Sequence, residues 1–258
     1  MIKVGLRLLT LLVAGLVAGS GCIYGTSEPW LGDAPQPALE STATTPEGGA
    51  SGVPRNGAVV FQFDDRVHPD SVGVDTLALT SGQNSVDAAR QVDLLACTVS
   101  LAPQSLLTAD LSYQAEASGL YGFGRGPLAE PVLVGFTTGS TTVDATPPAV
   151  VTTEEIVREV LVPRCASCHD DHYPPGGLSL TSEDAVNATL LDQDSAQRPG
   201  SPRVSRGSHA RSYLMWKVLG LPGIAGEPMP AGGDWAGGRQ CGTPDPDLAR
   251  LARWIDGL

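Results

Sequence analysis

Basic and aromatic residues are scarce in this chain, and it has no hydrophobic run long enough to cross a membrane. Its 258 residues include 16 Lys and Arg against 28 Asp and Glu, which gives a net charge of −12. An acidic surface repels phosphate backbones, so we expect no nucleic-acid partner. Aromatic residues make up only 5%, whereas 31 Gly and 21 Pro are present. This composition predicts several loop-rich modules rather than one large hydrophobic core.

The N-terminus has the pattern of an export signal. An almost wholly apolar run, Leu8 to Gly19, follows the positive residues Lys3 and Arg7. It is shorter than the roughly 20 residues of a transmembrane helix and fits the centre of a signal peptide. Residues 1–22 resemble a bacterial lipoprotein signal, which implies lipidation of Cys22 and an outer-membrane lipoprotein facing the periplasm or the cell surface. An ordinary secretory signal is the alternative, and both export the protein.

Two segments of different pattern follow the signal. Residues 23–52 are rich in Pro, Gly, Ser and Thr without a sustained apolar period, which predicts a flexible linker. From Pro54 onward, short segments of alternating polarity such as GAVVFQFDD are separated by turn residues, as in an all-β sandwich. Residues 53–140 also resemble bacterial Ig-like domains of secreted and surface proteins, through VVFQFDDRVHPDSV, LTADLSYQAEASGL and GFTTG. Such domains are spacers or adhesive modules, so the resemblance implies no catalytic residue here.

Helical patterns replace the strand patterns in the C-terminal part, residues 151–258, after a short Pro-containing linker at 141–150. Thr152, with a Glu three residues later, predicts a capping box at the start of a helix. Pro163 should end that helix just before a pair of cysteines, because proline cannot donate to the helical ladder.

Two more helices are predicted towards the C-terminus. One starts near Ser208, in SHARSYLMWKVLG. The other has Asp245 as its N-cap and Pro246 as its first residue. Its apolar residues recur at helical spacing and predict one buried stripe: Leu248, Leu251, Ala252 and Ile255. The predicted fold class is therefore multidomain, with an all-β Ig-like sandwich followed by a small all-α domain.

The cysteine pair that follows the first predicted helix forms C-x-x-C-H, the attachment motif of c-type haem. The residues are Cys165, Cys168 and His169. Two thiols three residues apart can each add to one vinyl group of the same porphyrin, and the next imidazole can then reach the iron. Attachment takes place outside the cytoplasm, in agreement with the export signal. The motif occurs once, so we expect one haem c.

A redox-active pair and a zinc site are the two alternatives to haem for these cysteines. A redox-active pair is expected near a βαβ pattern, whereas here a helix leads in and a Pro/Gly loop leads out. A zinc site is the stronger alternative, because four residues could supply tetrahedral ligands: Cys165, Cys168, His172 and Cys241. That set leaves His169 without a role, and we therefore favour haem.

A second axial ligand to the iron should come from further along the chain. Met229 lies in the Pro-flanked loop GEPMPAGG, which can present a thioether, the sulfur ligand of many cytochromes c. Met215 lies in an apolar helical run and is expected in the core. His209 and His172 are alternative ligands, and His68 of the sandwich is expected at the surface.

Residues 150–258 as a whole resemble small cytochrome c domains of exported bacterial proteins. The shared runs are CASCH, GGLSL, RPGSP, SYLMWKV, EPMP and LARLARWIDGL, in this order. The resemblance implies covalent attachment of haem to Cys165 and Cys168, with His169 and Met229 as axial ligands. The chain departs from the family in Cys241, which can pair with Cys97 of the sandwich or stay free. Cys97 lies on a predicted strand, where a lone cysteine is most often a small buried hydrophobe.

The functional expectation is an exported, membrane-tethered electron carrier. Haem supplies one-electron chemistry, and the protein supplies ligation and orientation. Because two axial ligands fill the iron, we expect no substrate turnover and hence no enzyme. The partners would be an unidentified redox protein and the membrane that holds the lipid anchor. The alternative is a surface interaction or adhesion protein, in which the Ig-like domain binds a partner and the C-terminal domain is structural, with haem or zinc.

Overall fold

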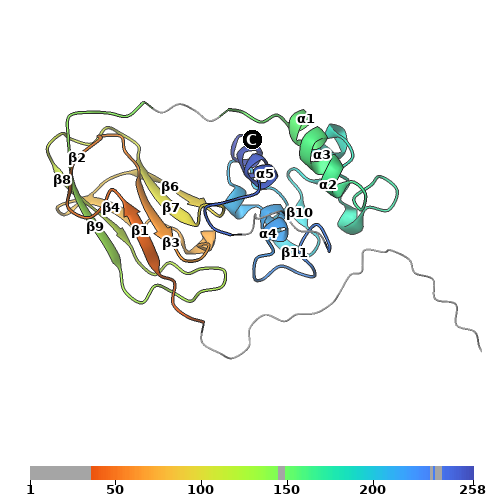
Figure 1. Cartoon of the computed structure of the whole chain (residues 1–258), viewed down its shortest axis with the longest axis horizontal. Coiled ribbons are helices and arrows are strands. Elements are labelled where there is room, and N and C mark those ends of the chain that lie inside the picture. The colour runs from red at the N-terminus through yellow and green to blue at the C-terminus, as the bar shows by residue number, and fades with distance from the viewer. Residues whose placement is uncertain (1–35, 145–148, 233–234, 236–239) are drawn as a thin grey trace, which may run out of the picture.

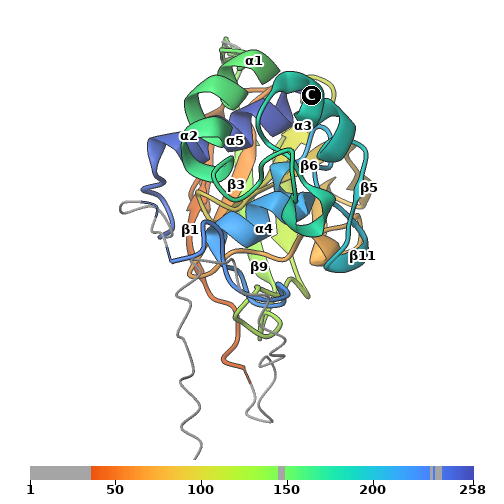
Figure 2. The same ribbon diagram turned by 90° about the vertical axis from the view of Figure 1, so that its right-hand side faces the viewer.

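A β-sandwich and a mainly helical unit make up the described part of the molecule (Figure 1). The computed structural model describes residues 36–144, 149–232, 235 and 240–258. Within these residues, no helix is long and apolar enough to cross a membrane. Helices α4 (Tyr213–Leu219) and α5 (Pro246–Asp256) lie next to the sandwich, whereas α1 (Thr153–Ile156), α2 (Val162–Cys165) and α3 (Glu183–Thr189) lie on the far side of the helical unit. Viewed from that far side, the helices cover the ends of the strands (Figure 2).

The sandwich consists of a four-stranded and a five-stranded sheet. The first sheet is antiparallel, in the order β1 (Ser41–Thr45), β3 (Val59–Phe63), β7 (Thr98–Pro103) and β6 (Ala88–Asp93). In the second sheet β2 pairs parallel to β9 and the other pairs are antiparallel. Its order is β2 (Ala50–Val53), β9 (Val132–Thr138), β8 (Ser112–Ala117), β4 (Leu77–Ser81) and β5 (Asn84–Ser85). A short 3₁₀ helix, η1 (Pro69–Ser71), follows β3.

The predicted alternation of apolar residues is confirmed in the sandwich core. Val59, Phe61 and Phe63 of β3 all point inward and are buried. Tyr113 of β8 and Phe136 of β9 stack with ring centroids 5.8 Å apart. Burial of one face of each sheet fixes the register, because a slip by one residue would turn every apolar side chain outward.

The flexible linker predicted for residues 23–52 is wrong over its second half. β1 pairs with β3, and β2 with β9, so the sandwich begins well before residue 53. Both are edge strands, and none of their side chains is fully buried. Small polar residues suffice on an edge, which is why the sequence shows no apolar period there. The predicted lipidation site Cys22, with the rest of the 1–22 signal, lies outside the described residues.

The C-terminal unit contains several short helices and one small sheet. The prediction that this unit is all-α is therefore incomplete, because β10 (Asp194–Ser195) and β11 (Arg198–Pro202) form an antiparallel pair. The remaining elements are α1 (Thr153–Ile156), a π-helical segment η2 (Val157–Leu161), α2 (Val162–Cys165), η3 (Pro175–Gly177), α3 (Glu183–Thr189) and η4 (His209–Arg211).

The first helix begins as predicted but does not end at Pro163. Thr152 and Glu155 form the capping box, with Glu155 N 3.2 Å from Thr152 Oγ1 and Thr152 N 2.8 Å from Glu155 Oε2. The π turn then carries the chain past the proline. Val162 N–H bonds to Val157 O, five residues back, and α2 starts with Pro163 in its first turn. A missing N–H is tolerated there, so the helix runs on to Cys165.

The last helix and the helical core agree with the sequence pattern. Asp245 caps α5 through Asp247 N at 2.9 Å. The predicted stripe of Leu248, Leu251, Ala252 and Ile255 is buried. The helix expected from near Ser208 is present in two pieces, η4 and α4, separated at Ser212.

Aromatic packing joins the two units. His68 of the sandwich lies among Tyr121, Phe123 and Trp216, with ring centroids 5.3, 4.6 and 5.3 Å away. Trp216 comes from α4 of the helical unit, so the prediction that His68 is a surface residue is wrong. Tyr121 and Phe123 lie between β8 and β9 of the sandwich, and Trp216 lies in the other unit. All three are far from His68 in the sequence, so no local pattern could show these contacts. Burial lowers the pKa of His68, and Arg198 and Arg211 add to this effect against the opposing influence of Asp70.

We predict that His68 makes stability fall on mild acidification. Its folded-state pKa lies below the usual 6.5, so the unfolded chain takes up the proton first as the pH falls. The stabilisation is therefore complete above about pH 6.5 and is lost below it. Urea unfolding at pH 7.5 and 5.5 should show a larger loss for the wild type than for His68→Phe, which keeps an aromatic ring but cannot titrate. Equal losses in the two proteins would contradict this role.

Candidate functional site

The C-x-x-C-H segment forms a tight turn at the end of α2. Cys168 N and His169 N both donate to the carbonyl of Cys165, at 3.1 and 3.0 Å. Cys165 is half-buried against the hydrophobic core of the helical unit, whereas Cys168 is exposed. Neither thiol is in a disulfide. The turn therefore presents two free thiols and an imidazole over five consecutive residues.

The imidazole of His169 is oriented by a backbone carbonyl. Its Nδ1 lies 2.9 Å from Leu178 O, so with the proton on Nδ1 the ring donates there and Nε2 keeps a free lone pair. In metal-ligating histidines, the ring nitrogen that does not bind the metal typically donates a hydrogen bond of this kind. Leu180 N donates to His169 O at 2.9 Å and holds the backbone as well.

The protonation states fit a ligand better than a redox catalyst. Burial lowers the pKa of His169, and the nearby cations Arg203 and Lys217 lower it further against the opposing effect of the Leu178 carbonyl. The imidazole is then neutral near pH 7, as metal binding requires. Burial raises the pKa of the Cys165 thiol to about 11. Redox-active C-x-x-C pairs depend on a lowered cysteine pKa, so this environment argues against such a pair.

Met229 lies at the edge of the same hydrophobic core. Its side chain is half-buried and packs against the cluster that Cys165 and Leu178 also contact. Its backbone is held on both sides, because Met229 N donates to Lys217 O at 2.9 Å and Trp235 Nε1 donates to Met229 O at 3.1 Å. Met215 is 0% exposed, which confirms that it is a core residue.

Of the two histidine alternatives, His209 already has other partners in this structure. His209 uses both ring nitrogens, with Leu94 N–H donating to Nε2 at 3.1 Å and Nδ1 2.8 Å from Asp256 Oδ2. It is buried where the helical unit meets the turn after β6. His172 is exposed, in the loop just after the motif.

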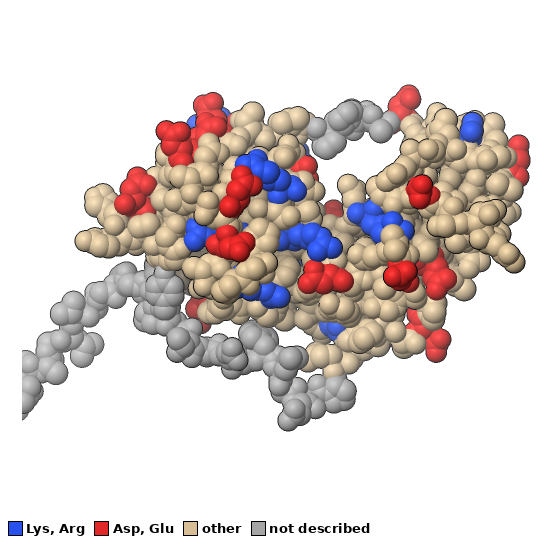
Figure 3. Space-filling model, turned by 180° about the vertical axis from the view of Figure 1, so that it is seen from behind, with Lys and Arg blue, Asp and Glu red and all other residues tan. Residues whose placement is uncertain are grey.

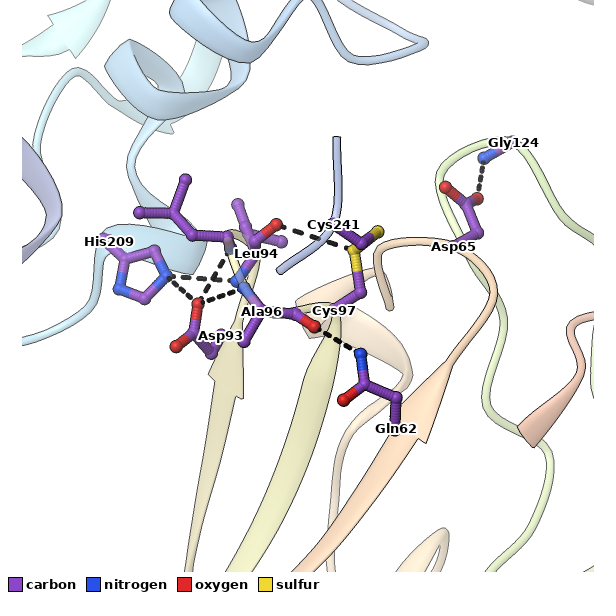
Figure 4. Close-up of a disulfide and its surroundings, with 10 residues drawn as sticks. Gln62, Asp65, Asp93, Leu94, Ala96, Cys97, Gly124, His209 and Cys241 are labelled. Carbon is purple, nitrogen blue, oxygen red and sulfur yellow. Dashed lines mark hydrogen bonds and ion pairs between the residues drawn. A yellow bond between two sulfur atoms is a disulfide. The ribbon is translucent and has the colours of Figure 1, made fainter. Parts of the chain in front are cut away.

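The two remaining described cysteines form a disulfide between the units (Figure 4). Cys97 and Cys241 have Cα atoms 5.4 Å apart, and Gly242 N donates to Leu95 O at 2.9 Å beside them. Cys97 is buried as expected, but it lies in the turn before β7 rather than on a strand, with a φ of 57°. A disulfide sulfur is no thiolate ligand, so the zinc set built on Cys241 is lost.

The described residues hold no group of three or more His, Cys, Asp or Glu side chains arranged to bind a metal ion. Haem attachment through a C-x-x-C-H motif would need no such cluster, because the thiols would hold a porphyrin and the histidine would supply one ligand. On the face shown in Figure 3, Lys and Arg lie among Asp and Glu rather than in a continuous basic patch.

Sequence reasoning missed the residues that surround Met229. Lys217 lies in the apolar run SYLMWKV, and Trp235 lies six residues after Met229 in a Gly-rich stretch. The guanidinium of Arg164, next to the motif, lies 4.6 Å from the centre of the Trp235 ring. A single charged residue in an apolar helical run was the available signal for Lys217.

Comparison with known families concerns the sandwich. Residues 33–138 match the model of the bacterial Ig-like domain family. The sandwich is a bacterial Ig-like domain. Domains of this family occur in extracellular bacterial proteins, in agreement with the predicted export. The match ends before the helical unit, and no curated protein matches the chain.

Similarity to solved structures is low. The N-terminal part of the bacterial S-layer protein SbsC has a TM-score of 0.32 and 14% identity, covering 45% of this chain and 26% of that one. An L,D-transpeptidase from Mycobacterium smegmatis has a TM-score of 0.30 and 19% identity, covering 39% and 40%. PcoC, a methionine-rich copper resistance protein from Escherichia coli, has a TM-score of 0.29 and 15% identity, covering 39% and 98%. The chain spans less than half of the S-layer and transpeptidase structures, and none of these similarities indicates a function.

We predict that the Cys97–Cys241 disulfide stabilises the whole described structure. It closes a loop with a sequence separation of 144. Replacing both cysteines by serine should lower the free energy of unfolding by about 2–5 kcal/mol, because the unfolded chain regains entropy. Urea unfolding measures the loss, and a reductant should weaken the wild type equally while leaving the double variant unchanged. An unaltered free energy of unfolding in the double variant would contradict the prediction.

Proposed function

We propose that this protein is an exported c-type cytochrome that transfers single electrons through one covalently bound haem. The observation that carries this proposal is the C-x-x-C-H turn, with two thiols outside any disulfide and His169 oriented by Leu178 O. The other two described cysteines are paired with each other. An exported protein that leaves one close pair of thiols unpaired has a use for them other than a structural disulfide.

The helical unit contains the residues that would hold a haem. Cys165 and Cys168 would form the thioether bonds, and His169 Nε2 and the Met229 sulfur would be the axial ligands. The bound haem would supply the exchange between Fe(III) and Fe(II). Around it, the half-buried Leu178 and the core that Cys165 and Met229 contact would exclude water from one side of the group. Such a hydrophobic shell controls solvent access and hence the reduction potential.

An electron carrier is favoured over an enzyme in this proposal, because His169 and Met229 would both bind the iron and would leave it no position for a substrate. The zinc form of the alternative function lacks its fourth ligand, since Cys241 is in the disulfide. The Ig-like domain would then act as a spacer. With a lipid anchor at Cys22, it would hold the haem unit away from the membrane and towards a redox partner protein.

We predict that haem attachment depends on the two thiols of the motif. Expressed with a c-type maturation system, the protein should keep its red colour on a denaturing gel, because thioether bonds survive unfolding. Cys165→Ala combined with Cys168→Ala should remove the colour, whereas the Cys97 and Cys241 double variant should keep it. Extraction of the haem from the native protein by acid–acetone would refute covalent attachment.

We predict that Met229 ligates the iron and that Met215 does not. Sulfur ligation gives low-spin ferric haem a weak far-red absorption band and raises the potential. Met229→Ala should therefore abolish the band and lower the potential. Met215→Ala should keep the band but cost about 2–5 kcal/mol of stability, because it leaves a cavity in the core. A band that survives Met229→Ala would show that another residue is the ligand.

A further inference from the structure

Lys217 is a buried cation that the proposed function does not use. The chain contains two lysines, Lys3 in the predicted signal and Lys217 in α4, while arginine supplies its other basic residues. Lys217 is 6% exposed. Lysine is almost never buried unless its ammonium is paired or hydrogen-bonded, since an unsatisfied buried charge is very costly. A single buried lysine in an arginine-using chain therefore needs a specific partner.

The partners of Lys217 all lie in the loop that leads to Met229. Its Nζ donates to the backbone carbonyls of Ala225 and Glu227, at 2.8 and 2.5 Å. Its own carbonyl accepts the N–H of Met229 at 2.9 Å. One residue of α4 thus holds the loop at three points, the last of them on Met229 itself.

Tyr213, one helical turn before Lys217, makes a fourth contact with the loop. Its hydroxyl accepts the N–H of Ala225 at 2.9 Å. Residues 225–229 have no regular secondary structure, so bonds to α4 replace the ladder that a helix or strand would supply. We call Tyr213 and Lys217 together the α4 clamp. Because α4 packs in the core through Met215 and Trp216, the clamp connects the loop to a rigid element.

We propose that Lys217 is the positioning residue that holds Met229 against the haem, an inference that rests on the proposed function. A ligand on an irregular loop has to be held within roughly 0.5 Å of its working position, which requires hydrogen-bonded support. Lysine suits the task better than arginine. Its ammonium is compact and has three rotatable donors, so it can serve two carbonyls that a planar guanidinium does not match.

Lys217→Met tests the clamp in the full-length, haem-loaded protein. Methionine keeps most of the apolar stem but removes the charge and the donors. We expect the far-red band of sulfur ligation to weaken or vanish. Imidazole should bind the ferric protein roughly tenfold more tightly, since lost hydrogen bonds from a charged donor free the loop by about that factor. Amide hydrogen exchange over residues 225–229 should become faster.

Two further variants separate the positioning role of Lys217 from the electrostatic effect of its charge. Lys217→Arg keeps the charge and should still loosen the loop, with tighter imidazole binding. Arg206→Met removes a positive charge from an exposed pair with Asp192 and should leave the band, imidazole affinity and loop exchange unchanged. A Lys217→Met variant that changes only the potential would show a purely electrostatic effect and would overturn the positioning role. Unchanged band, affinity and exchange would overturn it as well.

Further measurements distinguish a folding failure of Lys217→Met from a failure of the wild type to bind haem. If Lys217→Met fails to fold, Tyr213→Phe removes only the hydroxyl acceptor and should give a smaller change of the same sign. No change in loop exchange or imidazole affinity in that variant would overturn the clamp. If the wild type holds no haem, the proposed function fails. Hydrogen exchange over 225–229 in wild type and Lys217→Met then still shows whether the clamp exists.

Discussion

The disulfide between Cys97 and Cys241 constrains both units at once. It ties the turn between β6 and β7 to the segment before α5, and Gly242 N–H bonds to Leu95 O next to it. Leu94 and Leu95 of this turn are buried in the hydrophobic core of the helical unit. The sandwich therefore supplies part of the core on which α4 and α5 pack. Two modules that read as separate in sequence form one folded body through this turn.

Polar contacts around the disulfide explain why the turn can be buried. Asp93 Oδ1 accepts the N–H groups of Leu95 and Ala96, at 2.8 and 2.9 Å, and Leu94 N–H bonds to His209 (Figure 4). A buried turn without such partners would leave backbone donors unsatisfied, at a cost of about 1–3 kcal/mol each. His209, which could have been an iron ligand, is thereby committed to joining the units.

The candidate haem residues also pack against this core. Cys165, Leu178 and Met229 all pack against it, and α4 contributes both Trp216 to the junction with the sandwich and Lys217 to the loop of Met229. One short helix therefore contacts both the junction with the sandwich and the loop of Met229. In the proposed cytochrome, the Ig-like domain would be more than a spacer, because it would stiffen the support of an axial ligand.

The sequence by itself determined the elements whose signals are local. The apolar alternation of β3, the capping box at Thr152, and the N-cap and buried stripe of α5 need only neighbouring residues, and all three are present. The C-x-x-C-H motif, which carries the proposed function, is likewise a local pattern. The sequence does not predict the edge strands β1 and β2, because an exposed edge needs no apolar period. It also does not predict that the helix continues past Pro163, because a π turn accommodates the proline.

Only the tertiary structure decided the contacts between residues far apart in the chain. It paired Cys97 with Cys241, assigned His209 to Leu94 and Asp256, and packed His68 against Trp216. It also brought the ammonium of Lys217 onto two carbonyls of the Met229 loop. A cysteine, histidine or lysine has several possible partners of equal chemistry. Which one it meets depends on how the sheets and helices pack, and that packing is set by the burial of the whole core.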